Sequence, residues 1–155
     1  MAQSAQATEP AVRVVFGAGI RATIAMETGR LGASKALVLA TPQQCDAALE
    51  IAELLGPTAV GVFCKAAMHT PVDVTNAAME HISEVGADCL IAIGGGSTTG
   101  LGKAIAYRND LPQITIPTTY AGSEATPILG QTEDGIKTTL IDPRVLPEVI
   151  LYDAE

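Results

Sequence analysis

The chain has 155 residues and a formal net charge of −8, which suits one domain with a substantial core and argues against a nucleic-acid backbone as partner. No apolar run approaches the roughly 18 residues that a transmembrane helix needs, so no membrane span is expected. Hydrophobic residues make up 48% of the sequence and aromatic residues 3%, without Trp, so we expect a core of Ala, Val, Ile and Leu, as in parallel α/β sheets.

Residues 1–10 are small and polar, and they lack the basic and apolar regions of a secretory signal. We therefore expect a flexible arm there and a cytoplasmic protein. The three cysteines, Cys45, Cys64 and Cys89, are scattered without CxxC spacing. An odd number of cysteines in a chain that is not exported predicts that all three are reduced, with Cys64 and Cys89 filling the core.

Apolar runs followed by helical stretches recur through the first 117 residues. The predicted strands are 12–16, 36–40, 58–64, 90–93 and 113–117, and the predicted helices are 20–31, 43–55, 72–85 and 97–108. Ser97 is the expected N-cap of the last of these helices. Because strand and helix alternate through short connections, we predict an α/β fold with a doubly wound, mostly parallel sheet.

The alternation stops after the fifth strand. A polar loop at 118–124 is followed by two candidate strands, 128–133 and 136–141, joined by Asp134-Gly135. An Asp-Gly step between two such runs is a strong hairpin signal, so we predict a β-hairpin near the C-terminus. A short final strand is predicted at 149–152.

The stretch 88–103 contains the clearest functional signal, because three glycines, 94–96, follow a buried strand and precede a helix. Glycine lets a ligand approach the backbone, and a helix N-terminus offers free N–H groups. This predicts a phosphate or pyrophosphate site, with a purely structural tight turn as the alternative. The stretch is not a GxGxxG fingerprint, because Thr99 replaces the third glycine, and it also misses the P-loop pattern.

A second glycine turn, Gly17-Ala18-Gly19, follows the first strand. It resembles the opening of a dinucleotide fingerprint, but Ala22 stands where the last glycine would be. A simple strand-to-helix turn is the favoured interpretation.

Ligands of an open α/β sheet bind beyond the carboxyl ends of its strands. The segments expected there are 94–98, 118–123, 41–42 and 69–70. Hydroxyl groups and backbone amides dominate this set, which suits a phosphorylated cofactor. His69 is either an ordinary loop histidine or a catalytic residue, and Lys137 either contacts phosphate or ribose or is an exposed hairpin residue. His69 and His81 are too widely separated to predict a metal site.

The second strand ends without the acidic residue that NAD-selective sites often place there. It runs into Thr41-Pro42-Gln43-Gln44, and the next acid is Asp46. We therefore predict weak discrimination between NADH and NADPH.

Three blocks, FGAG at 16–19, GGGS at 94–97 and PTTYAGSE at 117–124, resemble the iron-containing (group III) alcohol dehydrogenase superfamily in order and spacing over nearly the whole chain. The sequence departs from the usual superfamily pattern at two places, and at both it resembles the maleylacetate reductase subfamily. Gly100 stands where an Asp usually follows GGGS, and the loop is shorter than the usual PTTxGTGSE. The triplet His69-Thr70-Pro71 is also similar to that subfamily.

The resemblance implies that 11–155 form a Rossmann-like cofactor-binding domain, and that the catalytic histidine and any metal ligands belong to a further helical domain. It implies NADH or NADPH as cofactor and no metal in this chain. Separately, we expect a homodimer, because an exposed cleft can drive dimerisation. The cofactor-binding residues that the resemblance implies are Gly95, Gly96, Ser97, Thr118, Thr119, Ser123 and Lys137. The position at the strand ends adds Gly94, Thr98 and Thr41 to this predicted set. Tyr120 would face the cleft and, with His69, is the candidate for a catalytic role.

The activity implied by this resemblance is the NAD(P)H-dependent reduction of maleylacetate to 3-oxoadipate in aromatic-compound degradation, with the substrate bound through the helical domain. The alternatives are a metal-dependent alcohol or glycerol dehydrogenase, and a stand-alone nucleotide-binding module without catalysis. We expect these 155 residues alone to be catalytically inactive.

Overall fold

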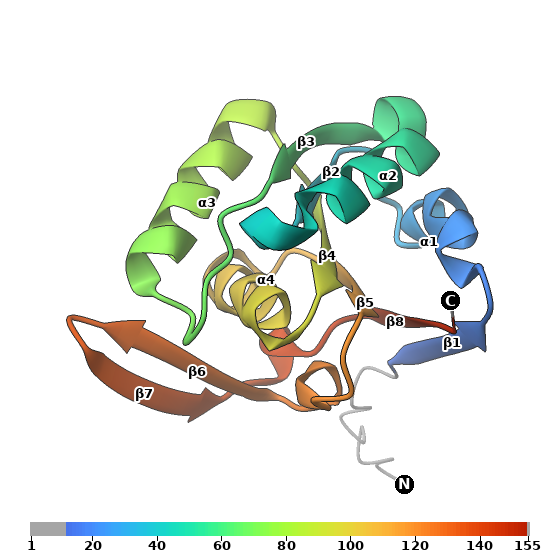
Figure 1. Cartoon of the computed structure of the whole chain (residues 1–155). Coiled ribbons are helices and arrows are strands. Elements are labelled where there is room, and N and C mark those ends of the chain that lie inside the picture. Colours follow the sequence, from blue (N-terminus) through green and yellow to red (C-terminus); the bar gives the residue numbers. More distant parts are fainter. Residues whose placement is uncertain (1–11, 155) are drawn as a thin grey trace, which may run out of the picture.

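The computed structural model describes residues 12–154, so the predicted arm at 1–10 lies outside the described residues. The six strands of the main sheet are β1 (Arg13–Gly17), β2 (Ala36–Leu39), β3 (Ala59–Phe63), β4 (Cys89–Gly94), β5 (Gln113–Pro117) and β8 (Val149–Asp153). The helices are α1 (Ile24–Arg30), α2 (Cys45–Leu55), α3 (Val72–Val85) and α4 (Gly96–Asn109), and the hairpin consists of β6 (Ile128–Glu133) and β7 (Ile136–Ile141). Figure 1 shows their arrangement.

All six strands of the main sheet run parallel, in the order β1-β8-β5-β4-β2-β3. After β3 the chain crosses back over β2 to form β4, so the direction of strand addition reverses between β2 and β4. The loops at the carboxyl ends of these two strands therefore diverge and leave room for a ligand. The predicted doubly wound parallel sheet is confirmed.

Helices cover both faces of the sheet (Figure 1). On one face, α1 and α2 pack through Ile24 and Ile51 against a cluster that includes Val38, Ile91 and Ile93. On the other face, α3 and α4 supply the buried residues Ala78, Ile82, Leu101 and Ile105, which pack against Leu37, Leu39, Leu90 and Ala92. Alternate residues of β2 and β4 thus enter opposite clusters, which explains why both strands are apolar throughout.

The hairpin forms as predicted, with Asp134 and Gly135 at φ 51° and 76°. Positive φ at both central turn positions matches the twist of the two strands, and Asp-Gly tolerates this conformation well. Backbone contacts then tie the hairpin to the loop before α3, because Thr132 N donates to Thr70 O over 3.0 Å. A small cluster of Ala104, Leu129 and Val145 packs it against α4.

The first predicted helix, 20–31, is divided into a 3-10 turn at Ile20–Thr23 and α1 at Ile24–Arg30. The predicted N-cap at Ser97 is wrong, because α4 begins at Gly96 and Gly95 occupies the N-cap position. Glycine allows the chain to turn sharply from β4 into the helix without a side-chain cap, so the helix starts earlier than the cap rule suggests. Within residues 12–154, no helix combines the length and apolar character that crossing a membrane requires.

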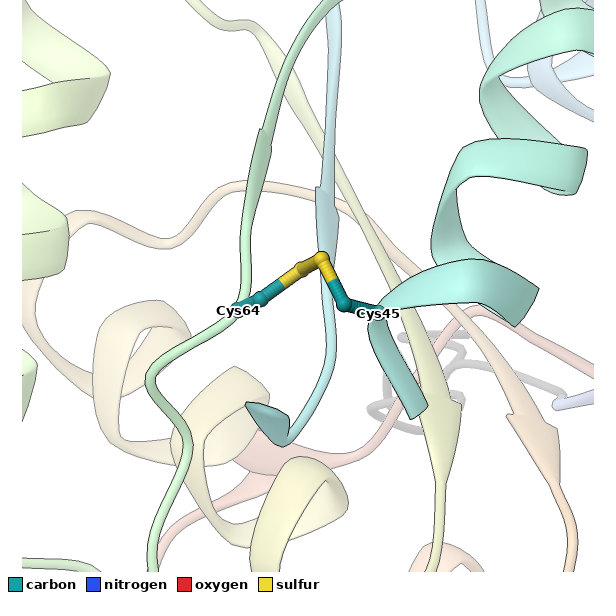
Figure 2. Close-up of a disulfide and its surroundings, with 2 residues drawn as sticks. All are labelled: Cys45 and Cys64. Carbon is teal, nitrogen blue, oxygen red and sulfur yellow. A yellow bond between two sulfur atoms is a disulfide. The ribbon is translucent and has the colours of Figure 1, made fainter. Parts of the chain in front are cut away.

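The prediction of three reduced cysteines is also wrong, because Cys45 and Cys64 form a disulfide (Figure 2). Cys45 begins α2 and Cys64 directly follows β3. Since β2 and β3 are neighbours, the turn after β2 and the end of β3 meet at one sheet edge, with the two Cα atoms 5.5 Å apart. Cys89 is buried as predicted, and burial raises the pKa of its thiol to about 12.

Candidate functional site

The turn between β4 and α4 is shaped by three glycines with different surroundings. Gly94 has φ 148°, and a Cβ there would lie 2.5 Å from Gln44 Oε1 and 2.6 Å from Thr98 Oγ1. A Cβ at Gly95 would lie 3.1 Å from Thr119 Cγ2, whereas a Cβ at Gly96 would meet nothing within 4 Å. The fold therefore explains Gly94 and Gly95, while Gly96 leaves open space in front of the helix.

The helix end itself offers hydrogen-bond donors. The amide of Thr99 bonds Gly95 O over 3.1 Å, so the amides of Gly96, Ser97 and Thr98 precede the first bond of the helix. The Thr98 hydroxyl is fully buried and has no hydrogen-bond partner among the described residues. The three free amides, with the positive end of the helix dipole, form an anion site of the kind that a phosphate group fits.

The loop after β5 forms the second wall of the site. Thr118 N donates to Gly94 O over 2.9 Å, and Thr118 Oγ1 accepts a hydrogen bond of 3.0 Å from Gln44 Nε2. Thr119 packs on Gly95. The glycine turn, the segment after β2 and the loop after β5 thus meet at the carboxyl edge of the sheet.

Most of the predicted site residues line two hollows, whereas Gly94, Gly95, Thr98 and Thr41 line neither of them. One, of about 220 Å³, is lined by His69, Gly96, Ser97, Ser123 and Lys137 among others, and the second, of about 330 Å³, by Thr118, Thr119 and Tyr120 with Phe16 and Tyr152. Tyr120 is fully exposed, whereas the side chain of Thr98 is buried, so only the amide of Thr98 lies at the helix end. Thr41 lies at the start of the turn that leads into α2, where its carbonyl accepts from Gln44 N.

The loop that carries His69 is held in an unusual conformation. His69 and Thr70 have φ 66° and 46°, a region that residues other than glycine rarely adopt. Thr70 is buried and occupies the space beside Gly100, where any Cβ would collide with its hydroxyl. The absence of a side chain at Gly100 therefore makes room for Thr70, which gives the departure from the usual Asp a packing reason.

Lys103 is the functional candidate that sequence reasoning missed. Its side chain is 1% exposed, and Nζ donates to Ser123 Oγ, Thr126 Oγ1 and Ile128 O over 3.3, 3.1 and 2.8 Å. Burial lowers the pKa of Lys103 to about 8, and the nearby Glu124 carboxylate opposes this shift. The lysine also lines the smaller hollow, and the only hint in the sequence was a charged residue directly before the apolar run Ala104–Ala106 of this helix.

The other glycine turn, after β1, is already occupied by a side chain of this protein. Asp153 accepts hydrogen bonds from Gly19 N at 3.0 Å and Arg21 N at 3.1 Å, and it pairs with Arg21 Nε at 2.8 Å. Its side chain is 1% exposed. The interpretation of Gly17-Ala18-Gly19 as a structural turn fits this arrangement.

A parallel, doubly wound sheet with an open glycine turn at a helix N-terminus is the architecture of nucleotide-binding α/β domains. A family model described as iron-containing alcohol dehydrogenase matches residues 10–154, and the chain belongs to this family. Residues 12–154 hold no group of three or more His, Cys, Asp or Glu side chains that could bind a metal ion, so no ligand set for the iron of the family's name is found among them.

The chain is 64% identical over 148 residues to maleylacetate reductase of Rhizobium sp. (strain MTP-10005), covering 96% of this chain and 42% of that protein. It is 56% identical over 143 residues to maleylacetate reductase of Sphingobium indicum, covering 92% of this chain and 40% of that protein. The crystal structure of maleylacetate reductase from Agrobacterium tumefaciens superposes with a TM-score of 0.91 at 62% identity, over 93% of this chain and 41% of that chain. The chain thus spans about two fifths of the length of these relatives.

Proposed function

We propose that this chain is the cofactor-binding part of a maleylacetate reductase, which uses NADH or NADPH to reduce maleylacetate to 3-oxoadipate in the degradation of aromatic compounds. The identities of 64% and 56% to proteins of that name support the reaction. The observation that carries the binding role is the open space in front of Gly96, beside amides that no helix bond uses.

The cofactor fits the donors at this edge of the sheet. The diphosphate would lie on the turn at 94–98, against the amides of Gly96, Ser97 and Thr98. The ribose next to nicotinamide would reach Thr118, Thr119 and Ser123. Lys137 lines the same hollow as Ser97, so its ammonium group would face the diphosphate. Thr41 would lie near the adenosine ribose. Hydride transfer is the chemistry that the bound cofactor supplies, while the residues of this chain bind and orient it.

We assign catalysis to the part of the maleylacetate reductases that this chain does not match, which is about three fifths of their length. His69 and Tyr120 each line one of the two hollows, and among residues 12–154 neither side chain has a hydrogen-bonded partner of the kind that general acids and bases use. The 155-residue chain should therefore bind cofactor without turnover. Incubation with maleylacetate and NADH, followed at the absorbance of NADH, tests this, and measurable oxidation of NADH would contradict it.

We also propose that the protein is a homodimer located in the cytoplasm. Size-exclusion chromatography with light scattering tests the assembly, and a monomeric mass at all concentrations would contradict it.

Titration of the chain with NADH, followed by the fluorescence of the cofactor, tests the binding role. Gly96→Val should weaken binding on the order of 100-fold, because the side chain enters the ligand's space without clashing inside the protein. Gly29→Val is the matched control, since Gly29 is also helical, exposed and free of neighbours but lies on α1. Equal affinities of the wild-type chain and Gly96→Val would refute the proposal.

A further inference from the structure

We call the glycine turn at 94–98, the segment 41–44 and the loop at 117–123 together the cradle. Lys103 joins the glycine turn to the loop. It belongs to α4, whose first residues form the glycine turn, and all three of its hydrogen bonds go to the segment 123–128 after the loop that carries Thr118 and Thr119. Its acceptors are two hydroxyl groups and one carbonyl, all uncharged. A buried ammonium group satisfied by neutral oxygens is costly for a fold, so its presence calls for a role.

The contacts of Lys103 hold the loop after β5 in place and are not needed to hold α4. Glu124 is 4% exposed and accepts a hydrogen bond of 2.9 Å from Tyr152 OH, so its charge stays close to Lys103 while its position is set by β8. The remaining loop has few restraints at its tip, where Tyr120 is fully exposed. Removing the ammonium group would release Ser123 and Ile128 from α4 while leaving the glycine turn in place.

We propose that Lys103 is a positioning residue for cofactor binding: it holds the loop at 117–128 at the distance from α4 that lets both walls contact one dinucleotide. This rests on the proposed function. The diphosphate and adenosine half of the cofactor uses the glycine turn, and the nicotinamide half uses the loop. Loss of Lys103 therefore weakens binding of the whole dinucleotide more than binding of ADP.

The test compares NADH and ADP affinities of wild type, Lys103→Met, Lys103→Arg and the exposed control Lys35→Met by calorimetric titration. Lys103→Met should weaken NADH binding on the order of tenfold and ADP binding less than about threefold, because several charge-assisted hydrogen bonds to the loop are lost. Lys103→Arg should restore part of the NADH affinity. Unchanged NADH affinity, or equal losses for NADH and ADP, would overturn the proposal.

The experiment also distinguishes a folding defect of the variant from a failure of the proposed function. If Lys103→Met does not fold, Thr126→Val removes one acceptor of the ammonium group, and the same selective loss for NADH is expected with the same contradicting result. If the wild-type chain binds neither NADH nor ADP, the proposed function fails, whereas wild-type binding with an unselective Lys103 variant rejects the positioning role alone.

The disulfide supports an independent inference. Cys45 directly follows Gln44, which donates to Thr118 and lies against Gly94, so the cross-link anchors a residue of the cradle to the end of β3. Both cysteines are partly exposed at this edge. The glycine turn, Gln44 and the disulfide therefore form one connected group.

We infer that Cys45 and Cys64 form a redox-sensitive site that couples the thiol state of the protein to cofactor affinity. A dithiol reductant attacks one sulfur through its thiolate and forms a mixed disulfide, and its second thiol then releases the protein. The S–S bond breaks, each cysteine sulfur gains one proton and one electron, and the reductant becomes a disulfide. The released start of α2 no longer holds Gln44 against Thr118.

The test counts thiols and measures affinity in both redox states. The denatured protein should show one reactive thiol, from Cys89, before treatment with dithiothreitol and three afterwards. The reduced chain should bind NADH about 2- to 12-fold more weakly, since a preorganised contact becomes mobile. Cys64→Ser should bind NADH as weakly as the reduced wild-type chain, with or without reductant. Cys89→Ala should still bind NADH more tightly in the oxidised state than in the reduced state. Three thiols without reductant, or equal affinity in both states, would overturn the inference.

Discussion

Two glycine turns in this protein follow parallel strands and lead into helical turns, yet only one is open. After β1, Asp153 fills the turn and accepts from Gly19 N and Arg21 N. After β4, the amides beside Gly96 face open space. The same local sequence type thus yields a structural joint in one place and a candidate ligand site in the other.

The two turns differ in the residue that the neighbouring strand places beside the glycine. Gly17 pairs with Asp153 across the β1–β8 ladder, which places a carboxylate directly at the turn. Gly94 pairs with Pro117 across the β4–β5 ladder, and the next residues carry only hydroxyl groups. A glycine turn becomes an anion site when the protein supplies no anion of its own.

Asp153→Ala should have the largest effect on stability. The substitution leaves two backbone amides and the Arg21 guanidinium without their carboxylate, so we expect a loss of about 3 kcal/mol in the free energy of unfolding. Urea denaturation measures it. A loss near zero would mean that the turn after β1 does not depend on its internal anion.

Gly94→Ala should destabilise the protein by about 2 kcal/mol, because φ 148° and the contacts with Gln44 and Thr98 both oppose a side chain. Gly96→Ala, the matched variant two residues along, should leave the denaturation midpoint close to that of wild type. Equal destabilisation by the two variants would contradict the distinction between structural and ligand-facing glycines in the open turn.

The cations beside the two turns differ as well, because Arg21 pairs with a carboxylate while Lys103 bonds only neutral oxygens. The folded-state pKa of Lys103 is about 8, below the ordinary value of about 10.4, so the folded state binds this proton less tightly than the unfolded state. Stability contributed by Lys103 should be present above about pH 10 and decline as pH falls through about 8.

Urea denaturation of wild type and Lys103→Met at pH 7 and pH 10 measures this pH dependence of stability. The other titrating groups are common to both chains, so their contributions cancel in the comparison. The stability of wild type relative to the variant should be greater at pH 10. A difference that stays constant or decreases with pH would contradict the buried state of the ammonium group.

The smallest effect concerns the cofactor's 2′-phosphate. Because 41–44 carry no acid and Asp46 is exposed on α2, we expect NADH and NADPH affinities within about threefold of each other. Competitive titration measures the ratio. A preference for NADH of tenfold or more would show that another group repels the phosphate.

The sequence predicted the strands, their parallel arrangement and the hairpin because these follow from local patterns: apolar runs, short connections and an Asp-Gly step. It also placed Gly94–Gly96 and Thr118–Thr119 at one edge, since parallel strands end on the same side. These predictions needed no knowledge of individual side-chain contacts.

The features that sequence reasoning missed all depend on contacts between distant segments. The Cys45–Cys64 bridge arises because β2 and β3 are neighbours, the filling of the first turn arises from the β1–β8 pairing, and the environment of Lys103 is created by the loop 20 or more residues further on. The early start of α4 reflects a sharp glycine turn where a side-chain cap was expected.

The most direct measurement of the central claim is amide chemical-shift mapping of the ¹⁵N-labelled chain during titration with NADH. The amides of Gly96 and Ser97 should shift strongly and in proportion to saturation, while those of Gly19 and Arg21, already bonded to Asp153, should stay in place. Shifts at Gly19 and Arg21 without shifts at Gly96 and Ser97 would contradict the assignment of the open turn as the cofactor site.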